Sequence, residues 1–311
     1  MIDCRDPLIH LRSARRLVLG ALAATFIFNP AAALTQGVLA PDREAAKRGE
    51  YLFSAGGCAG CHTDVKNKGP VGAGGRALKT PFGTFYGPNI TPDPDQGIGR
   101  WSDADFMRAL RDGVSPQATH YFPVFPFTSF TRISDADMRD LKAYLFSLPP
   151  SPKPNRPHEV GFPFDRRFVQ YFWKRLFFDR GAFVADAGRS AELNRGAYVV
   201  EALGHCGECH TPRNLFGASD RSLAYAGTRD GPEGAKAPNI TPDRETGIGK
   251  WTVGDLTDLL KTGMTPDGDF VGATMAEVVR ATTGKLSERD LKAMVAYLRA
   301  LQPIRNDLRG K

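Results

Sequence analysis

The sequence predicts a mostly α-helical protein of two tandem domains joined by an aromatic, proline-rich linker. Three observations predict this fold: a long internal repeat, one Cys-x-x-Cys-His motif in each copy, and apolar stripes at helical spacing bounded by capping residues and prolines. The chain has 311 residues, of which 41% are apolar, so it is long enough to build two compact cores.

The internal repeat has an offset of about 150 residues. The segment Pro-Asn-Ile-Thr-Pro-Asp at 88–93 returns unchanged at 238–243, and the Gly-Ile-Gly-x-Trp segment at 97–101 returns at 247–251. A repeat of this length indicates a duplicated domain and not a solenoid unit. We therefore place the first domain at 43–150, the linker at 151–186 and the second domain at 187–303.

Both copies predict the same elements in the same order. A first helix, at 43–55 and 190–203, is followed by the Cys-x-x-Cys-His motif and a Gly/Pro-rich loop. A short helix comes next, capped by Ser102 or Thr252 with an aspartate three residues later. The final helix begins at Ser134 or Ser287 and stops before Pro149 or Pro303. Gly49 and Gly196 lie in the first helices. Because glycine has no side chain, we expect each first helix to cross closely over the final helix of its copy near Tyr144 or Tyr297.

Four prolines within 149–154 span the end of the first domain and the start of the linker, which continues as an aromatic, basic run from Phe162 to Phe178. Two interpretations are open. The run forms a helix wedged between the two domains, with its aromatic side buried, or it forms a docking surface for a partner or for the membrane interface.

The two Cys-x-x-Cys-His motifs, Cys58–His62 and Cys206–His210, are the candidate functional sites. In this motif the thiols form thioether bonds to a haem and the adjacent histidine binds the iron, so the sequence predicts two covalently bound haem c groups. The predicted attachment residues are Cys58, Cys61, Cys206 and Cys209, and the predicted proximal iron ligands are His62 and His210. Each histidine is expected to donate its other ring nitrogen to a carbonyl group. A zinc site would need four ligands, and neither copy offers another cysteine; the fifth, Cys4, lies at the extreme N-terminus.

In the second copy, the predicted sixth iron ligand is Met275. Met275 lies in an expected loop before the last helix and fits a thioether ligand, which raises the reduction potential and suits electron transfer. Met264 is a rival, and a methionine at either position is otherwise a core residue.

In the first copy, the residue that aligns with Met275 is Phe125, which cannot bind iron. Three explanations are open: the iron is five-coordinate with Phe125 shielding an open face, His120 is the sixth ligand, or a more distant residue substitutes for it. The substitutes in the third explanation are Met107, Met138 and, in the linker, His158.

The N-terminus predicts a signal peptide at 1–33. Basic residues up to Arg16 precede the short apolar run Leu17–Phe28, and Ala31–Ala33 offers a cleavage site near Ala33. An uncleaved anchor is the alternative. The predicted location is the periplasm. The formal charge of +7 is compatible with an acidic docking partner, and no nucleic-acid partner is expected.

These motifs give the chain a specific family resemblance. The segment 204–214 around the second motif, both Asn-Ile-Thr-Pro-Asp segments and the linker stretch Trp173–Phe178 resemble the cytochrome c subunits of bacterial membrane-associated alcohol, gluconate and fructose dehydrogenases. The resemblance covers residues 43 to 303. It implies two class I cytochrome c-like domains that pass electrons from a dehydrogenase subunit to a downstream acceptor.

The chain departs from that family in two respects. Many members carry three haems and a C-terminal membrane-binding helix, whereas two motifs occur here, and Phe125 stands where the family has its axial methionine. The family often has a histidine at the position of His120 beside that methionine. We expect an electron-transfer subunit without catalytic activity of its own, in contact with a partner dehydrogenase and peripherally with a membrane. The alternative is a haem enzyme or small-ligand sensor that uses an open distal face on haem one.

Overall fold

The structure, a computed structural model, describes residues 42–308. The predicted signal peptide at 1–33 and Cys4 lie outside the described residues. None of the helices between residues 42 and 308 combines the length and the hydrophobicity that a bilayer crossing requires.

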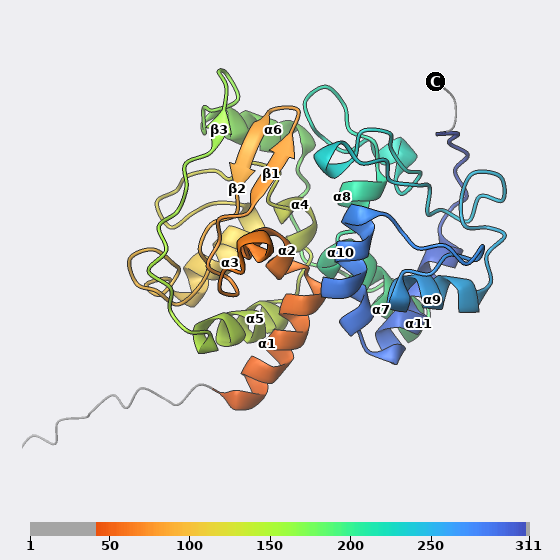
Figure 1. Ribbon diagram of the computed structural model, residues 1–311, viewed down its shortest axis with the longest axis horizontal. Coiled ribbons are helices and arrows are strands. Elements are labelled where there is room, and N and C mark those ends of the chain that lie inside the picture. Colours follow the sequence, from red (N-terminus) through yellow and green to blue (C-terminus); the bar gives the residue numbers. More distant parts are fainter. Residues whose placement is uncertain (1–41, 309–311) are drawn as a thin grey trace, which may run out of the picture. The chain divides into compact units, whose positions relative to one another are not determined.

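Helices dominate the described part of the chain, as the sequence predicts (Figure 1). The first copy contains α1 (Arg43–Ala55), α2 (Cys58–His62), η1 (Val65–Asn67), β1 (Ala77–Thr80), β2 (Gly83–Tyr86), α3 (Asp103–Asp112), α4 (Phe127–Phe130) and α5 (Asp135–Ser147). The linker contains β3 (Glu159–Val160) and α6 (Val169–Phe177). The second copy contains α7 (Ala191–Ala197), the π-helix η2 (Tyr198–Leu203), α8 (Gly207–His210), η3 (Arg221–Leu223), η4 (Pro232–Gly234), α9 (Val253–Thr262), α10 (Ala273–Ala281), η5 (Thr283–Lys285) and α11 (Glu288–Ala300).

The predicted helix starts are confirmed. Ser134 and Ser287 cap α5 and α11, each accepting a backbone N–H three residues later. Ser102 forms a reciprocal capping box with Asp105 at the start of α3, and the equivalent box occurs at the start of α9. These ends are set by local sequence, which explains why the repeat preserves them.

The predicted close crossing of the first and final helices is also confirmed. A Cβ atom at Gly49 would overlap the carbonyl oxygen of Asp140 and lie 2.7 Å from the Cβ of Tyr144. A Cβ atom at Gly196 would overlap the carbonyl of Ala293 in the same way, again with a tyrosine Cβ at 2.7 Å. In both copies the helix backbones therefore touch at a position that only glycine permits.

The first copy carries a small sheet that the sequence analysis placed in a loop. Strands β1 and β2 form an antiparallel hairpin, and β3 from the linker pairs with β2. The hairpin turns at 80–83, where the Thr80 hydroxyl donates to the Gly83 carbonyl at 2.9 Å. The stretch between Gly74 and Pro88 is three residues longer than its counterpart between Gly227 and Pro238, and the counterpart makes only a single bridge. The strands are too short to give a periodic signal.

The linker packs against both copies, and only part of its aromatic side is buried. Trp173 is half-buried, with its ring centroid 6.3 Å from that of Phe127 in the first copy and its indole N–H donating to the Phe216 carbonyl of the second. The Ser151 backbone N–H donates to the Thr91 hydroxyl at 3.1 Å, which holds the proline-rich part against the repeat motif. In and before α6, however, Phe168, Phe172 and Leu176 are 60–75% exposed. The interpretation of a helix that lies between the two copies with its aromatic side buried is therefore confirmed for Trp173 and wrong for Phe168, Phe172 and Leu176.

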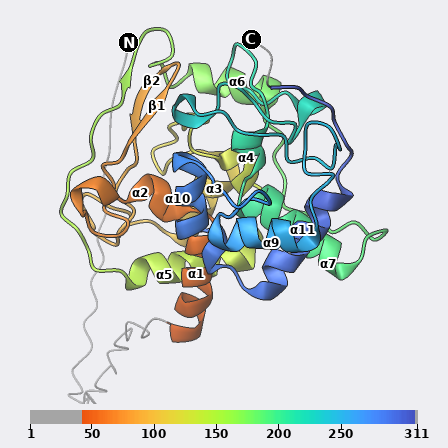
Figure 2. The same ribbon diagram turned by 45° about the vertical axis from the view of Figure 1, so that its right-hand side comes forward.

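The two copies share one apolar core. It includes Leu52 and Phe53 of α1 together with Val199 and Leu203 of η2. Where the copies meet, α1 contacts η2 and η5, and α2 contacts α10. Figures 1 and 2 show α1 and α5 crossing on one side of this region and α7 and α11 on the other.

Two reciprocal hydrogen bonds join the copies at the first turns of their final helices, α5 and α11. The Tyr51 hydroxyl of α1 donates to Asp290 of α11 at 2.5 Å, and the Tyr198 hydroxyl of η2 donates to Asp137 of α5. Both tyrosine oxygens also accept a backbone N–H from the helix cap, at 3.3 Å from Ser287 in one case and 3.1 Å from Ser134 in the other. The interface thus repeats the same contact in both directions, as expected when a duplicated unit packs against itself.

Candidate haem-binding site

Both Cys-x-x-Cys-His motifs line one continuous cavity of about 1720 Å³. Cys58, Cys61 and His62 lie on α2, and the second motif lies on and just before α8. We call the part of the cavity at Cys58–His62 site one and the part at Cys206–His210 site two. Typical single-ligand pockets are about 300–1,000 Å³, so the cavity has room for two large groups.

The proximal histidines have the predicted carbonyl partners. Nδ1 of His62 lies 2.7 Å from the Pro88 carbonyl oxygen, and Nδ1 of His210 lies 2.8 Å from that of Pro238. Because a carbonyl only accepts, each Nδ1 carries the proton and each Nε2 has a free lone pair. Burial lowers the pKa of both imidazoles, which favours the neutral form that a metal requires.

The cavity walls are apolar on both sides. Leu52, Ile98 and Phe106 contribute to site one, and Ile248 and Leu256 contribute to site two. Flat apolar walls beside paired thiols and a histidine with a free Nε2 fit a porphyrin that is bound covalently at its edge and through its iron. The residues present therefore fit haem at both sites.

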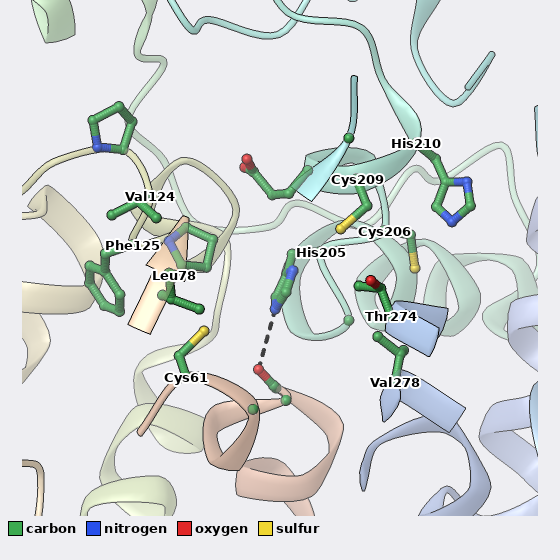
Figure 3. A pocket seen from close by; sticks show the side chains of 18 of the residues that line it. Cys61, Leu78, Val124, Phe125, His205, Cys206, Cys209, His210, Thr274 and Val278 are labelled. Atoms are coloured by element: carbon green, nitrogen blue, oxygen red, sulfur yellow. Dashed lines mark hydrogen bonds between the residues drawn. The ribbon is translucent and has the colours of Figure 1, made fainter. Parts of the chain in front are cut away.

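Met275 lines the cavity, but it does not lie in a loop. It is the third residue of α10, a helix that packs against α9. Thr274 and Val278 of the same helix also line the cavity. In Figure 3 these two side chains lie on the Cys206 side, and Phe125 lies on the Cys61 side. The loop expected before the last helix is thus a helix whose inner face carries the methionine.

Backbone hydrogen bonds support the alignment of Phe125 with Met275. The Tyr121 N–H donates to the Gly113 carbonyl in the first copy, and the Val271 N–H donates to the Gly263 carbonyl in the second. The two donors are 150 residues apart in the sequence, and so are the two acceptors. Phe125 lines site one and its ring lies 5.6 Å from that of Tyr121. Where site two presents a thioether, site one therefore presents an aromatic ring.

The structure brings only one of the other proposed site-one ligands to the cavity. His120 is outside the lining; its Nδ1 lies 3.2 Å from Nζ of Lys174. Met138 is fully buried in the core, and Met107 packs against the core without lining the cavity. In the second copy, the rival Met264 is 39% exposed and likewise outside the lining.

His158 does line the cavity, but its ring is engaged elsewhere. Its Nδ1 accepts the Tyr86 backbone N–H at 3.1 Å, so the neutral ring carries its proton on Nε2. In this tautomer neither nitrogen offers a free lone pair to iron.

One cavity residue, His205, was missed by the sequence analysis. Its Nε2 lies 3.3 Å from the Gly56 carbonyl oxygen, and Figure 3 shows the ring between the two motifs. Since the carbonyl accepts, Nε2 donates, and the bond ties the residue before Cys206 to the residues before Cys58. The aligned residue in the first copy is Gly57, and both residues have a positive φ. A histidine at a position where the other copy has glycine is the sequence signal that could have pointed to His205.

Comparison with known proteins agrees with this geometry. The sequence model of cytochrome c matches residues 46–149. A dihaem c-type cytochrome of Cereibacter sphaeroides is 46% identical over 263 residues, which is 83% of this chain and 86% of that protein. The chain therefore belongs to the cytochrome c family, whose haem is covalently bound.

Two longer relatives are named as dehydrogenase subunits. A nicotinate dehydrogenase subunit of Pseudomonas putida is 43% identical over 258 residues, or 82% of this chain and 21% of that protein. The fructose dehydrogenase cytochrome subunit of Gluconobacter japonicus is 38% identical over 261 residues, or 83% of this chain and 53% of that protein. The chain thus spans about half or less of these two relatives.

Proposed function

We propose that the protein is a periplasmic dihaem cytochrome c that transfers single electrons from a partner dehydrogenase to a downstream acceptor. The observation that carries the proposal is the single cavity that both Cys-x-x-Cys-His motifs line. Two redox groups in one apolar enclosure exchange electrons readily and are shielded from water. The names of the longer relatives support a dehydrogenase as the electron donor.

When bound, haem supplies one-electron iron chemistry, and the chain's own residues set its surroundings. The four motif cysteines would hold the groups at their edges. His62 and His210 present a neutral Nε2, because Pro88 and Pro238 fix the proton on Nδ1. The apolar walls exclude water from the iron. This would favour the ferrous state of the haem, because that state has the smaller net charge.

We further propose a tandem organisation with domains at 43–150 and 187–303 and a linker at 151–186. The repeated caps, glycine crossings and carbonyl acceptors support it. The predicted signal peptide at 1–33 would deliver the chain to the periplasm, where haem is attached.

For the sixth coordination positions, we propose Met275 at site two and no protein ligand at site one. Met275 and Phe125 align at an offset of 150 residues and both line the cavity, and only Met275 carries a donor atom. His120 is not chosen, because its ring lies outside the lining beside Lys174.

Potentiometric titration of the purified protein with its haems attached tests this function. We expect two one-electron steps at different potentials, and rapid equilibration after one site is reduced by a light pulse. The double variant Cys206→Ala with Cys209→Ala should retain one haem and one step. A wild-type protein with one step, or with no exchange between sites, would exclude the proposal.

A second function is favoured by one observation: Phe125 leaves site one without a distal donor. In this case the protein acts on a small molecule such as peroxide at site one, whereas carbon monoxide binding there is expected for either function. Turnover of peroxide by the reduced protein, abolished by Phe125→Met and unaffected by Met264→Leu, would establish an enzymatic role. Absence of turnover would leave electron transfer as the function.

A further inference from the structure

Helix α6 turns two polar side chains, Gln170 and Lys174, inward beside the half-buried Trp173 and Phe177, and it leaves other large apolar side chains exposed. Gln170 is 6% exposed and Lys174 is half-buried. Phe168, Phe172 and Leu176, in contrast, are 65%, 60% and 75% exposed. A helix on the surface of a water-soluble protein normally has the opposite arrangement.

The inward polar side chains fix this orientation. Nζ of Lys174 donates to the carbonyl oxygens of Asp112 and Gly113, both at 2.7 Å, and lies 4.5 Å from the ring centroid of Phe127. These are the last carbonyls of α3, which a cation satisfies well. Rotating α6 to bury its aromatic residues would break these bonds, so the outward display of apolar side chains is built into the fold.

A neighbouring loop extends the apolar display. The Trp173 indole N–H donates to the Phe216 carbonyl at 2.9 Å, and the rings of Phe177 and Phe216 stack at 5.9 Å. Leu215 is 94% exposed and Phe216 is 65% exposed. Just before α6, Phe162 is 79% exposed.

We propose that this surface rests on a bilayer containing anionic phospholipids. The α6 surface consists of Phe162, Phe168, Phe172, Leu176, Leu215 and Phe216. Exposed Arg166 and Arg175 stand among these residues and complement lipid phosphates. Aromatic side chains prefer the headgroup region, and an interfacial helix buries such a face there. In Figures 1 and 2, α6 lies at the end of the described structure away from α1 and α5.

The shape of the surface favours lipid over a protein partner. Leu215 and Phe162 project almost fully into solvent, and a protein interface would need preformed pockets that match each of them. A bilayer conforms to projecting side chains without such matching. The inference does not depend on the proposed electron-transfer role, since it concerns only the outer face of α6 and its neighbours.

Flotation of the purified protein, with haems attached, on extruded vesicles tests the proposal. One set is phosphatidylcholine alone and the other is equal parts phosphatidylcholine and phosphatidylglycerol. We expect strong flotation with the second set. Phe172→Ser combined with Leu176→Ser should weaken binding by about a hundredfold, since each large apolar side chain contributes about tenfold. Arg166→Gln combined with Arg175→Gln should remove most of the preference for the anionic set.

The matched control is Val65→Ser combined with Val253→Ser. These valines are 58% and 53% exposed but lie outside the α6 surface, on η1 and α9. The control should float like the wild type, and all variants must keep the wild-type haem absorbance and melting temperature. Equal flotation of the Phe172/Leu176 variant would overturn the proposal. Absence of flotation by the wild-type protein would also overturn the proposal. This holds even if sedimentation then shows a dimer that the Phe172/Leu176 variant abolishes, because the surface would be a protein interface.

Discussion

Site one and site two share their proximal side and differ on their distal side. His62 and His210 have the same carbonyl acceptor, the same Asn-Ile-Thr-Pro-Asp sequence follows each acceptor, and each copy has its glycine crossing. Elsewhere on the cavity wall, α10 contributes Met275, whereas an irregular loop before α4 contributes Phe125. The contacts that position His62 and His210 are therefore the same whether the cavity wall carries Met275 or Phe125. This independence allowed the two copies to differ at that position.

The largest effect is expected from making site two like site one. Met275→Phe should remove the thioether and lower the site-two potential by on the order of 0.2 V, within the range of about 0.8 V that axial ligands span. The ferrous protein should then bind carbon monoxide at both sites. Potentiometry and carbon monoxide titration measure these changes. The control Met264→Leu should change neither, and a Met275→Phe protein with wild-type potentials would exclude Met275 as a ligand.

The next largest effect tests what the two copies share. Gly49→Ala and Gly196→Ala each place a methyl group onto a helix carbonyl, which should cost about 3 kcal/mol of unfolding free energy in either copy. Denaturant unfolding gives the values. Gly161→Ala, where nothing lies within 4 Å, is the control. A large difference between Gly49→Ala and Gly196→Ala would show that the crossings are not equivalent.

A smaller effect is expected when site one is made like site two. Phe125→Met should raise the site-one potential by about 0.1 V and reduce carbon monoxide binding there. This rise in potential should be smaller than the fall expected for Met275→Phe. Phe125 lies in a loop before α4, so a methionine there is held less firmly than Met275 in its helix. Phe125→Leu supplies no donor and should leave the potential unchanged. An unchanged potential in Phe125→Met itself would contradict the alignment.

The smallest effect concerns the reciprocal tyrosine–aspartate contacts. Asp290 accepts two bonds from Arg195, at 2.8 and 2.7 Å, besides that from Tyr51, whereas the Asp137 carboxylate accepts from the Tyr198 hydroxyl. We expect Asp290→Asn to cost about 2 kcal/mol at pH 7 and Asp137→Asn about 1 kcal/mol, measured by denaturant unfolding.

The Asp290 contribution should also depend on pH. Burial acts to raise the pKa of Asp290, but hydrogen bonds from Arg195 and Tyr51 outweigh it and the pKa lies below its ordinary value. A lowered carboxyl pKa stabilises the fold above the unfolded pKa of about 3.9, and that stabilisation is lost as the pH falls through the folded pKa. The difference between wild type and Asp290→Asn should therefore shrink below about pH 4. A difference that is constant from pH 7 to pH 3 would contradict the assignment.

Sequence reasoning was most successful where local chemistry decides the structure. The caps at Ser134 and Ser287, the crossings at Gly49 and Gly196 and the carbonyl acceptors of the histidines all followed from residue type and spacing. It was unsuccessful where tertiary contacts decide. The orientation of α6 depends on Lys174 reaching the end of α3, and the place of Met275 in α10 depends on packing against α9. Periodicity carries no information about which side of a helix meets a distant carbonyl.

His205 shows a third limit. A histidine before the second motif has many roles in proteins, and only the packing of the two copies brings its Nε2 to the Gly56 carbonyl. The inequivalence of Phe125 and Met275, in contrast, could be found from the repeat alone, because the offset of 150 aligns them without a gap.

The magnetic resonance spectrum of the ferric protein, combined with carbon monoxide titration of the ferrous form, tests the inequivalence of the two sites most directly. We predict one high-spin and one low-spin iron, and one carbon monoxide bound per chain. Two low-spin irons with no carbon monoxide binding would contradict the account, because site one would then have a protein ligand in place of Phe125.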